Sequence, residues 1–278
     1  MKTFLFRIDL AVLACVLSLT LVVPASLAQP GYAMQNEIAY YGDDAPDEYA
    51  AEHCRLDVYH PENAEGFTTV VWLHAGGLRV GNRYIPGELR GKGFAIVPVD
   101  YRLSPRAKSP AFIEDAAAAV AWTIENIADY GGDPDRVIVA GASAGAYLAL
   151  LVGLDPSWLE THGIDADRLL GIGALAGHTV VHERIRWERG IKRTVPTVDE
   201  LAPLFHVRAD APPILLVTGD RELELLGRWE ENALLARMLK IEGHDDVELY
   251  ELEGFDHAGV EKPAHGLLLR WIGGVSGE

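Results

Sequence analysis

The sequence is poor in several features that define other classes of protein. Two of its 278 residues are cysteines, Cys15 and Cys54, which is too few for a disulfide framework. Basic residues are also outnumbered, with 24 lysines and arginines against 41 aspartates and glutamates and a formal net charge of −17. Because phosphate binding needs a basic face, this imbalance argues against a nucleic-acid partner. No repeat or low-complexity tract interrupts the chain.

Long apolar runs are scarce, and the one near the start is short for a membrane span. Lys2 and Arg7 precede an apolar run at 10–23, whereas a spanning helix needs about 20 residues. Small residues then stand one and three places before a cut after residue 28. We interpret 1–28 as a signal peptide. The mature protein is therefore expected to be secreted or periplasmic, with no stable membrane association. The alternatives are a retained anchor and a lipoprotein cysteine at Cys15.

What the sequence does contain is an alternation of buried-strand and helix patterns. With 49% hydrophobic residues, the chain can bury one large core. The runs expected to be strands are 52–61, 68–73, 94–99, 136–140, 170–175, 214–217 and 247–252. The helical patterns lie at 110–130, 144–154, 226–241 and 263–272. Parallel strands need such crossovers, so we predict a doubly wound, mostly parallel α/β sheet with helices on both faces.

Two segments stand outside this alternation. Residues 29–51 are polar and acidic, and we interpret them as an extended lead-in to a domain at 52–278. Residues 177–212 form the least regular stretch, which suits an insertion that forms a lid or a substrate wall.

A candidate nucleophile lies in the pattern Gly141-x-Ser143-x-Gly145. This pattern falls between a predicted strand and a predicted helix, where a serine sits on a sharp turn above the carboxyl end of the sheet. The glycines leave room for the helix to approach the strand closely. We interpret Ser143 as a nucleophile, against the alternative of a plain strand–helix turn.

A serine hydroxyl needs a base, and the base needs an orienting acid. His257 is the best candidate base because it lies in a loop just after a predicted strand. Asp220 and Glu222 compete as the acid, since both follow the predicted strand 214–217 and alternation gives them a similar facing. The order serine, acid, histidine fits hydrolases built on strand–turn–helix elbows.

Backbone amides that could hold a developing negative charge follow another buried strand. Gly76 and Gly77 come just after the strand that ends at Leu73, and the amide of Ala144 could join them. Cys54 is expected to be a buried strand residue and not a nucleophile.

These motifs together resemble a known group of enzymes. The segments are His74-Ala75-Gly76-Gly77, Asp100-Tyr101-Arg102, Gly141-Ala142-Ser143-Ala144-Gly145 and Gly254-x-x-His257. In order and spacing they are similar to α/β-hydrolase-fold carboxylesterases of the hormone-sensitive-lipase-like kind and to the related acetyl xylan and feruloyl esterases.

The resemblance carries expectations for the site. It favours Glu222 over Asp220 as the acid, although the family usually has aspartate there, and it implies Gly76, Gly77 and Ala144 as oxyanion donors. It also implies a structural role for Asp100 and Arg102, which we expect to form a buried pair. No cofactor or metal is expected.

The resemblance further implies hydrolysis of short-acyl esters, and we favour carbohydrate esters. Three polar residues of the irregular stretch, His178, Thr179 and His182, are the candidate substrate contacts. A serine peptidase of the same fold and a catalytically silent binding protein are the alternatives. The expected partner is a small-molecule or carbohydrate ester.

Overall fold

Six strands of one sheet run parallel and place their carboxyl ends along a common edge. The computed structural model describes residues 31–277, so the predicted signal peptide at 1–28 lies outside the described residues. The sheet has eight strands in the order β1-β2-β4-β3-β5-β6-β7-β8. The pairs from β4 to β8 are parallel, whereas β2 is antiparallel to both β1 and β4. The predicted α/β class and mostly parallel sheet are confirmed.

The element boundaries follow the sequence patterns closely in the middle of the chain. The strands are β1 Tyr32–Ala39, β2 Arg55–Pro61, β3 Phe67–Leu73, β4 Ala95–Val99, β5 Gly132–Ala142, β6 Gly171–Leu175, β7 Ile214–Gly219 and β8 Val247–Leu252. The α-helices are α1 Glu48–His53, α2 Ala111–Asn126, α3 Ala144–Leu154, α4 Ser157–Glu160, α5 Glu183–Glu188, α6 Arg228–Glu242 and α7 Glu261–Ser276. In the described part of the chain no helix is both long and apolar enough to cross a membrane.

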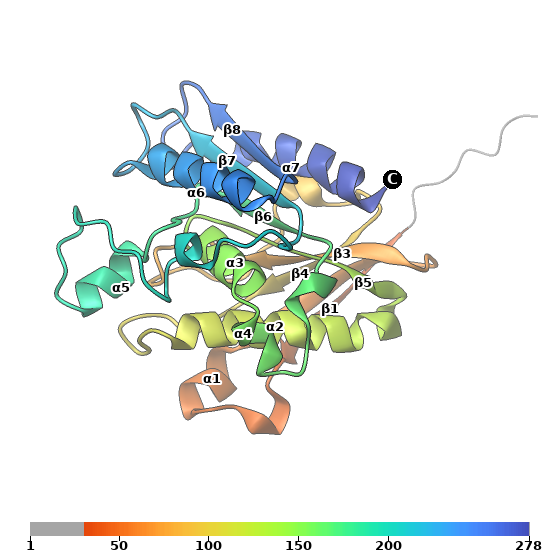
Figure 1. Cartoon of the computed structure of the whole chain (residues 1–278). Helices are drawn as coiled ribbons and strands as arrows, with labels where there is room; N and C mark the ends of the chain where they lie inside the picture. The colour runs from red at the N-terminus through yellow and green to blue at the C-terminus, as the bar shows by residue number, and fades with distance from the viewer. Residues whose placement is uncertain (1–30, 278) are drawn as a thin grey trace, which may run out of the picture.

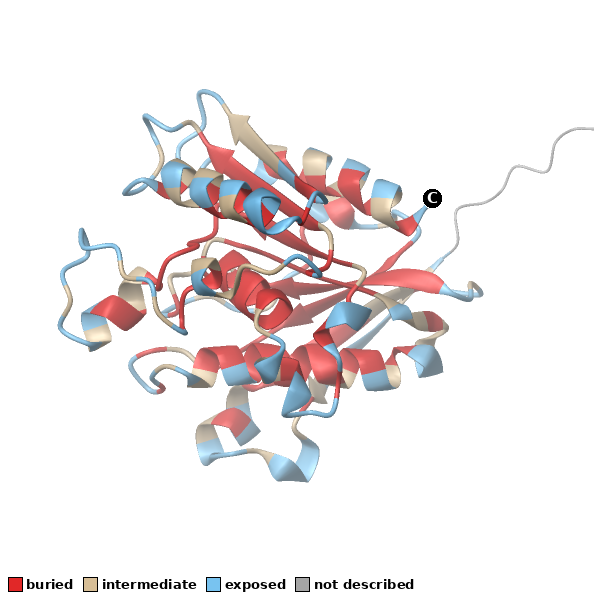
Figure 2. Cartoon of the chain, in the orientation of Figure 1, coloured by how far each residue is buried: buried red, intermediate tan, exposed pale blue. Residues whose placement is uncertain are grey.

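Helices cover both faces of the sheet, and alternating strand residues feed two apolar clusters. Val71 and Leu73 of β3 pack into the cluster that includes residues of α2, α3 and α6. Val70 and Trp72 point the other way, into the cluster that includes α7. The central strands are accordingly buried on both sides (Figure 2), as their continuous apolar sequences predict. Figure 1 shows the segment around α5 projecting from one end of the molecule.

The segment predicted as a lead-in belongs to the sheet. Strand β1 pairs with β2 in register from Tyr32 to Ala39, with one irregularity. Just beyond it, Tyr40 is buried and its hydroxyl donates to the carbonyl of Asp100 at 2.9 Å. The domain boundary expected at residue 52 is therefore wrong. No residue of β1 is buried and its central residues are exposed, so this edge strand lacks the continuous apolar run that marks the central strands.

Asp100 and Arg102 are both buried, but they do not pair with each other. The Arg83 amide donates to Asp100 Oδ1 at 2.5 Å, and the Arg83 guanidinium also pairs with that carboxylate. Arg102 instead forms an ion pair with Asp115 of α2, with Nη2 to Oδ1 at 2.7 Å. The expected Asp100–Arg102 pair is wrong because each of the two charges is already bound by another oppositely charged side chain, Arg83 for Asp100 and Asp115 for Arg102.

Candidate active site

Ser143 lies on a strained turn at the carboxyl end of β5. Its backbone has φ 51° and ψ −110°, a conformation that costs a non-glycine residue about 1–3 kcal/mol. The Ser143 amide donates to the carbonyl of Leu175 at 2.7 Å, which ties the turn to the end of β6. A Cβ on Gly145 would lie 2.0 Å from the carbonyl oxygen of Leu73. Glycine is therefore needed beside Ser143 for α3 to pack against β3.

The structure brings Ser143 and His257 together, although 114 residues separate them. The distance from Ser143 Oγ to His257 Nε2 is 2.9 Å. On its other side, His257 Nδ1 lies 3.0 Å from Glu224 Oε2. A neutral imidazole that donates from Nδ1 to this carboxylate leaves Nε2 free to accept the serine proton. Ser143 can thus pass its proton to His257, while Glu224 orients the imidazole ring.

The acid partner of His257 is Glu224, so the expected Glu222 is wrong. Alternation assumes that the chain continues extended after β7, but it turns helically. The amide of Glu224 donates to the Asp220 carbonyl at 2.8 Å, so the side chain of Glu224 returns toward the sheet while Glu222 is exposed. Alternation does not select Glu224, and its spacing of four residues from Asp220, one helical turn, is the sequence signal for it.

The other candidate acid, Asp220, holds the loop before His257 in place. Its Oδ2 accepts from the Gly254 amide at 2.8 Å, and its Oδ1 accepts from the Glu222 amide at 2.9 Å. It therefore joins the loop after β7 to the loop after β8.

The environment of Glu224 keeps its carboxylate charged. Its side chain is 1% exposed, and burial by itself raises the pKa. The hydrogen bond and charge of His257, the Leu225 amide and nearby Arg228 outweigh burial and lower the pKa of Glu224 below its ordinary value. An ionised acceptor beside Nδ1 favours a protonated imidazole once His257 has taken a proton.

The turn after β3 places two glycine amides beside Ser143. Gly76 has φ 129° and Gly77 has φ 62°, conformations that favour glycine. No hydrogen bond from either amide is found within residues 31–277. The first-turn amides of α3, which begins at Ala144, also have no helical partner. These amides are therefore available to a negatively charged oxygen.

The buried rings of His74 and Tyr101 pack against each other next to the glycine turn. His74 stacks on Tyr101 with 4.3 Å between ring centroids, and the Tyr101 hydroxyl donates to the His74 carbonyl at 2.7 Å. Desolvation lowers the pKa of His74, so its ring is neutral and its Nδ1 can donate to the Ala75 carbonyl at 2.6 Å.

A pocket of about 360 Å³ opens at Ser143. It is lined by polar groups of the site and by apolar side chains, among them Ser143, His257, Gly76, Gly77, Leu175, Leu225 and Val260. We call it the serine pocket. A concave, largely preformed pocket with a few converging polar groups is the usual form of a small-molecule site.

The three predicted substrate contacts lie behind this pocket and not in its wall. His178, Thr179 and His182 are all buried. His178 Nδ1 lies 3.0 Å from Glu231 Oε2 and its Nε2 lies 2.9 Å from Arg228. The Thr179 hydroxyl donates to the Glu231 carbonyl at 2.8 Å.

His182 is likewise occupied by the fold, because its Nδ1 accepts from the Arg184 amide at 3.0 Å and caps α5. The assignment of these three residues to substrate is therefore wrong. Their polarity satisfies buried groups, a role that sequence alone does not separate from substrate binding. In residues 31–277 no group of three or more metal-binding side chains is assembled.

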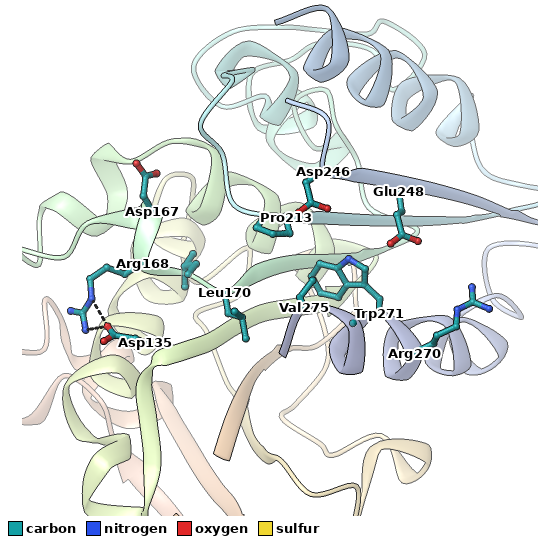
Figure 3. A pocket seen from close by; sticks show the side chains of 12 residues that line it. Asp135, Asp167, Arg168, Leu170, Pro213, Asp246, Glu248, Arg270, Trp271 and Val275 are labelled. Carbon is teal, nitrogen blue, oxygen red and sulfur yellow. Dashed lines mark hydrogen bonds and ion pairs between the residues drawn. The ribbon is translucent and has the colours of Figure 1, made fainter. Parts of the chain in front are cut away.

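Two other features carry no hydrolytic chemistry. Burial raises the pKa of the Cys54 thiol to about 12, so this buried cysteine is inert at neutral pH. A pocket of about 550 Å³ lies at the amino ends of β6, β7 and β8, as the placement of Leu170, Pro213 and Asp246 shows (Figure 3). Its lining includes no serine, cysteine or histidine.

Comparison with solved structures identifies the fold. A truncated carbohydrate esterase from gut microbiota aligns with a TM-score of 0.73 at 17% identity, over 90% of this chain and 98% of that one. Esterase 2 of Thermogutta terrifontis with bound butyrate aligns with a TM-score of 0.65 at 23% identity, over 87% and 92% of the two chains. The chain has the α/β-hydrolase fold.

Sequence comparison points the same way for this α/β-hydrolase. The family model described as BD-FAE matches residues 56–168. Esterase LipQ of Mycobacterium tuberculosis is 33% identical over 149 residues, which cover 47% of this chain and 35% of LipQ. Esterase LipC of the same organism is 28% identical over 209 residues, covering 67% and 50%. The chain thus resembles carboxylesterases of its fold, while spanning half the length of these curated relatives or less.

Proposed function

We propose that this α/β-hydrolase is a serine carboxylesterase that cleaves short-acyl esters of carbohydrates through an acyl-enzyme. The observation that carries the proposal is the continuous hydrogen-bonded line from Ser143 Oγ through the ring of His257 to Glu224. The esterases among its sequence relatives add support.

In the first step Ser143 is acylated. His257 Nε2 takes the hydroxyl proton while Oγ bonds to the ester carbonyl carbon, and the carbonyl oxygen becomes an anion. The amides of Gly76, Gly77 and Ala144 stabilise that anion. The tetrahedral intermediate then collapses, the bond to the alcohol oxygen breaks, and the alcohol leaves with the proton from His257.

In the second step water replaces the alcohol. His257 takes a proton from water, whose oxygen bonds to the acyl carbon. The bond to Ser143 Oγ then breaks, and His257 returns the proton to the serine. The products are the free acid and the original enzyme.

The size of the serine pocket supports short acyl groups. Its volume of about 360 Å³ is near the lower end of the range for small-molecule sites. The carbohydrate part of the proposal rests on likeness to the carbohydrate esterase from gut microbiota, not on His178, Thr179 or His182.

The direct test compares hydrolysis of p-nitrophenyl acetate and butyrate by the chain from residue 29 and by its Ser143→Ala variant. We expect turnover that is lost in the variant by several powers of ten. Covalent labelling of Ser143 by a fluorophosphonate reports the nucleophile directly. Release of acetate from acetylated xylan then tests the carbohydrate part, and peptide amides test the peptidase alternative. Unlabelled Ser143 and equal rates in both chains would favour a silent binding protein.

We also propose that the protein is exported after cleavage behind residue 28. The support is the charged start and short apolar run of the sequence. Mass spectrometry of the protein from its producing cells would find a chain that starts at residue 29, and an intact first methionine would refute the proposal.

A further inference from the structure

A second pocket adjoins the serine pocket. Its volume is about 480 Å³, and it shares Gly76, Gly77 and Glu183 with the lining of the serine pocket. The remaining side chains that line it are Arg79, Val80, Arg184, Trp187 and Arg193. We call this second space the arginine pocket.

The charge of the arginine pocket is opposite to that of the whole protein. The chain carries a net charge of −17, yet three arginines and a single carboxylate, Glu183, line this space. The arginines come from two separate segments, the turn after β3 and the chain around α5. Tertiary structure therefore gathers positive charge beside the proposed oxyanion site.

Two of the arginines are held through one nitrogen each. Arg184 Nε donates to Ser104 Oγ at 2.8 Å, and Arg193 Nε donates to Glu183 Oε2 at 2.5 Å. Arg184 Nε also lies 3.6 Å from Glu188 Oε1, so both guanidinium groups form an ion pair on the Nε side. No hydrogen bond from their terminal nitrogens is found within residues 31–277. Each group is therefore oriented by the protein while its terminal donors remain available.

Trp187 fixes the plane of one of these groups. The Arg184 guanidinium lies 4.0 Å above the Trp187 ring centroid, in a cation–π arrangement that leaves the edge of the guanidinium free. The Arg184 side chain is 11% exposed, whereas Trp187 as a whole is 64% exposed. An exposed indole beside a fixed guanidinium offers an apolar wall next to hydrogen-bond donors.

The third arginine extends from the glycine turn itself. The Arg79 amide donates to the Gly76 carbonyl at 3.1 Å, and the Arg79 side chain is on the surface. Movement of this chain segment would therefore affect both the glycine amides and the arginine pocket.

We propose that the arginine pocket binds a carboxylate carried by the ester substrate itself, with the ring of Trp187 packing against the adjoining part of that substrate. Planar guanidinium groups match carboxylates in geometry as well as charge. The inference rests on the proposed esterase function and narrows its substrate to acidic esters. The carboxylate can belong to the alcohol part or to the acyl part, and the two are separated by experiment.

The experiment measures kcat/KM for two matched pairs of esters. For the alcohol part the pair is 4-acetoxybenzoate and 4-acetoxybenzamide. For the acyl part the pair is ethyl hydrogen glutarate and ethyl glutaramate. We expect the carboxylate to be preferred by about tenfold in one of the pairs, the effect of one charged hydrogen bond. That preference should fall when NaCl is raised from about 0.05 M to about 0.5 M, because salt screens exposed charges.

Variants assign the preference to the pocket. Arg79→Gln, Arg184→Gln and Arg193→Gln are compared with Arg237→Gln, which removes one positive charge from the exposed surface of α6, outside both pockets. We expect at least one pocket variant to lose most of the preference while the rate on the amide partner stays within about twofold. The amide rate also shows that each variant is folded, and Arg79 is the safest position because its side chain is exposed.

The outcomes separate the two proposals. If Ser143-dependent hydrolysis of the neutral esters is present but neither pair shows a carboxylate preference, the carboxylate site is refuted and the esterase remains. The same holds if a preference exists but is unchanged in all three pocket variants. If neutral esters are not hydrolysed in a Ser143-dependent way, the esterase proposal itself fails.

Discussion

Glu224 combines a buried side chain with a carboxylate that stays charged. Its side chain is nearly inaccessible, yet its pKa is lowered because His257, the Leu225 amide and Arg228 stabilise its charge. A lowered folded pKa contributes stability that is present above the unfolded value of about 4.3 and lost as pH falls through the folded value. Glu224 therefore remains ionised throughout the neutral range, where His257 is expected to act.

The first prediction concerns this acid. Glu224→Gln should lower kcat/KM for p-nitrophenyl acetate on the order of a thousandfold or more, because an amide no longer stabilises the protonated ring of His257. The matched control is Glu222→Gln, two residues away and exposed, for which we expect a change within about twofold. If Glu222→Gln is the damaging change and Glu224→Gln is not, our assignment of the acid is wrong.

At the scale of elements, the contact between β3 and the start of α3 holds Ser143 in its turn. The carbonyl of Leu73 lies so close to Gly145 that an added Cβ would be 2.0 Å from it. Any side chain there must push α3 away from the sheet, and Ser143 with it.

The second prediction follows from that contact. Gly145→Ala should lower the free energy of unfolding by about 2–3 kcal/mol, a typical cost of overpacking, and should also reduce esterase activity. Gly266→Ala is the control, because this glycine of α7 has open space around it and alanine is the better helix former by about 1 kcal/mol. Urea unfolding of both variants checks the prediction, and equal stability of the two would contradict it.

Helix α5 depends on a neutral histidine. His182 is buried, and its Nδ1 accepts from the Arg184 amide at the start of α5. Desolvation, followed by the charges of His178, Arg228 and Arg186, lowers the pKa of His182 well below its ordinary value. A protonated Nδ1 could not accept this hydrogen bond.

The third prediction is a pH dependence with a definite sign. Since the folded pKa of His182 lies below the unfolded value of about 6.5, the unfolded state binds the proton first as pH falls. The free energy of unfolding should therefore decrease as pH falls below about 6.5, by up to about 1.4 kcal/mol per pH unit from this group. His182→Asn keeps a capping acceptor without titration. Urea unfolding from pH 7.5 to about 5.5 should show wild type losing stability relative to this variant, and parallel curves would count against the prediction.

At the scale of the whole molecule, the segment before residue 52 supplies the edge strand of the sheet. Strand β1 extends the sheet beyond β2. Asp47 forms an ion pair with buried Arg102, with Oδ2 2.8 Å from Nη1. This segment therefore supports groups that belong to the core.

The fourth prediction tests this role. A chain from residue 52 should be less stable than a chain from residue 31 by at least about 3 kcal/mol, because it loses the burial of Tyr40 and Ala50 as well as the pairing of β1. The free energy of unfolding in urea measures the difference. Equal values for the two chains would restore residue 52 as the domain boundary.

Patterns within short stretches of sequence determined the α/β class, the central strands and the turn that carries Ser143. Short, continuous apolar runs rich in β-branched residues are typical of strands buried on both faces. The glycines around Ser143 are typical of a strand–turn–helix elbow, although the contact that requires Gly145 is with Leu73 of the neighbouring strand β3. His257 was likewise predictable because it follows the last strand closely.

Tertiary structure alone decided which polar side chains meet. The helical turn after β7 selects Glu224 over Glu222, and the packing around α6 buries His178, Thr179 and His182 instead of exposing them to substrate. The partners of Asp100 and Arg102 stand 17 and 13 residues away in the chain, and the arginines that gather beside Gly76 come from two separate segments. The physical reason is that hydrogen bonds and ion pairs act over a few ångströms in space, a separation that the order of residues does not specify.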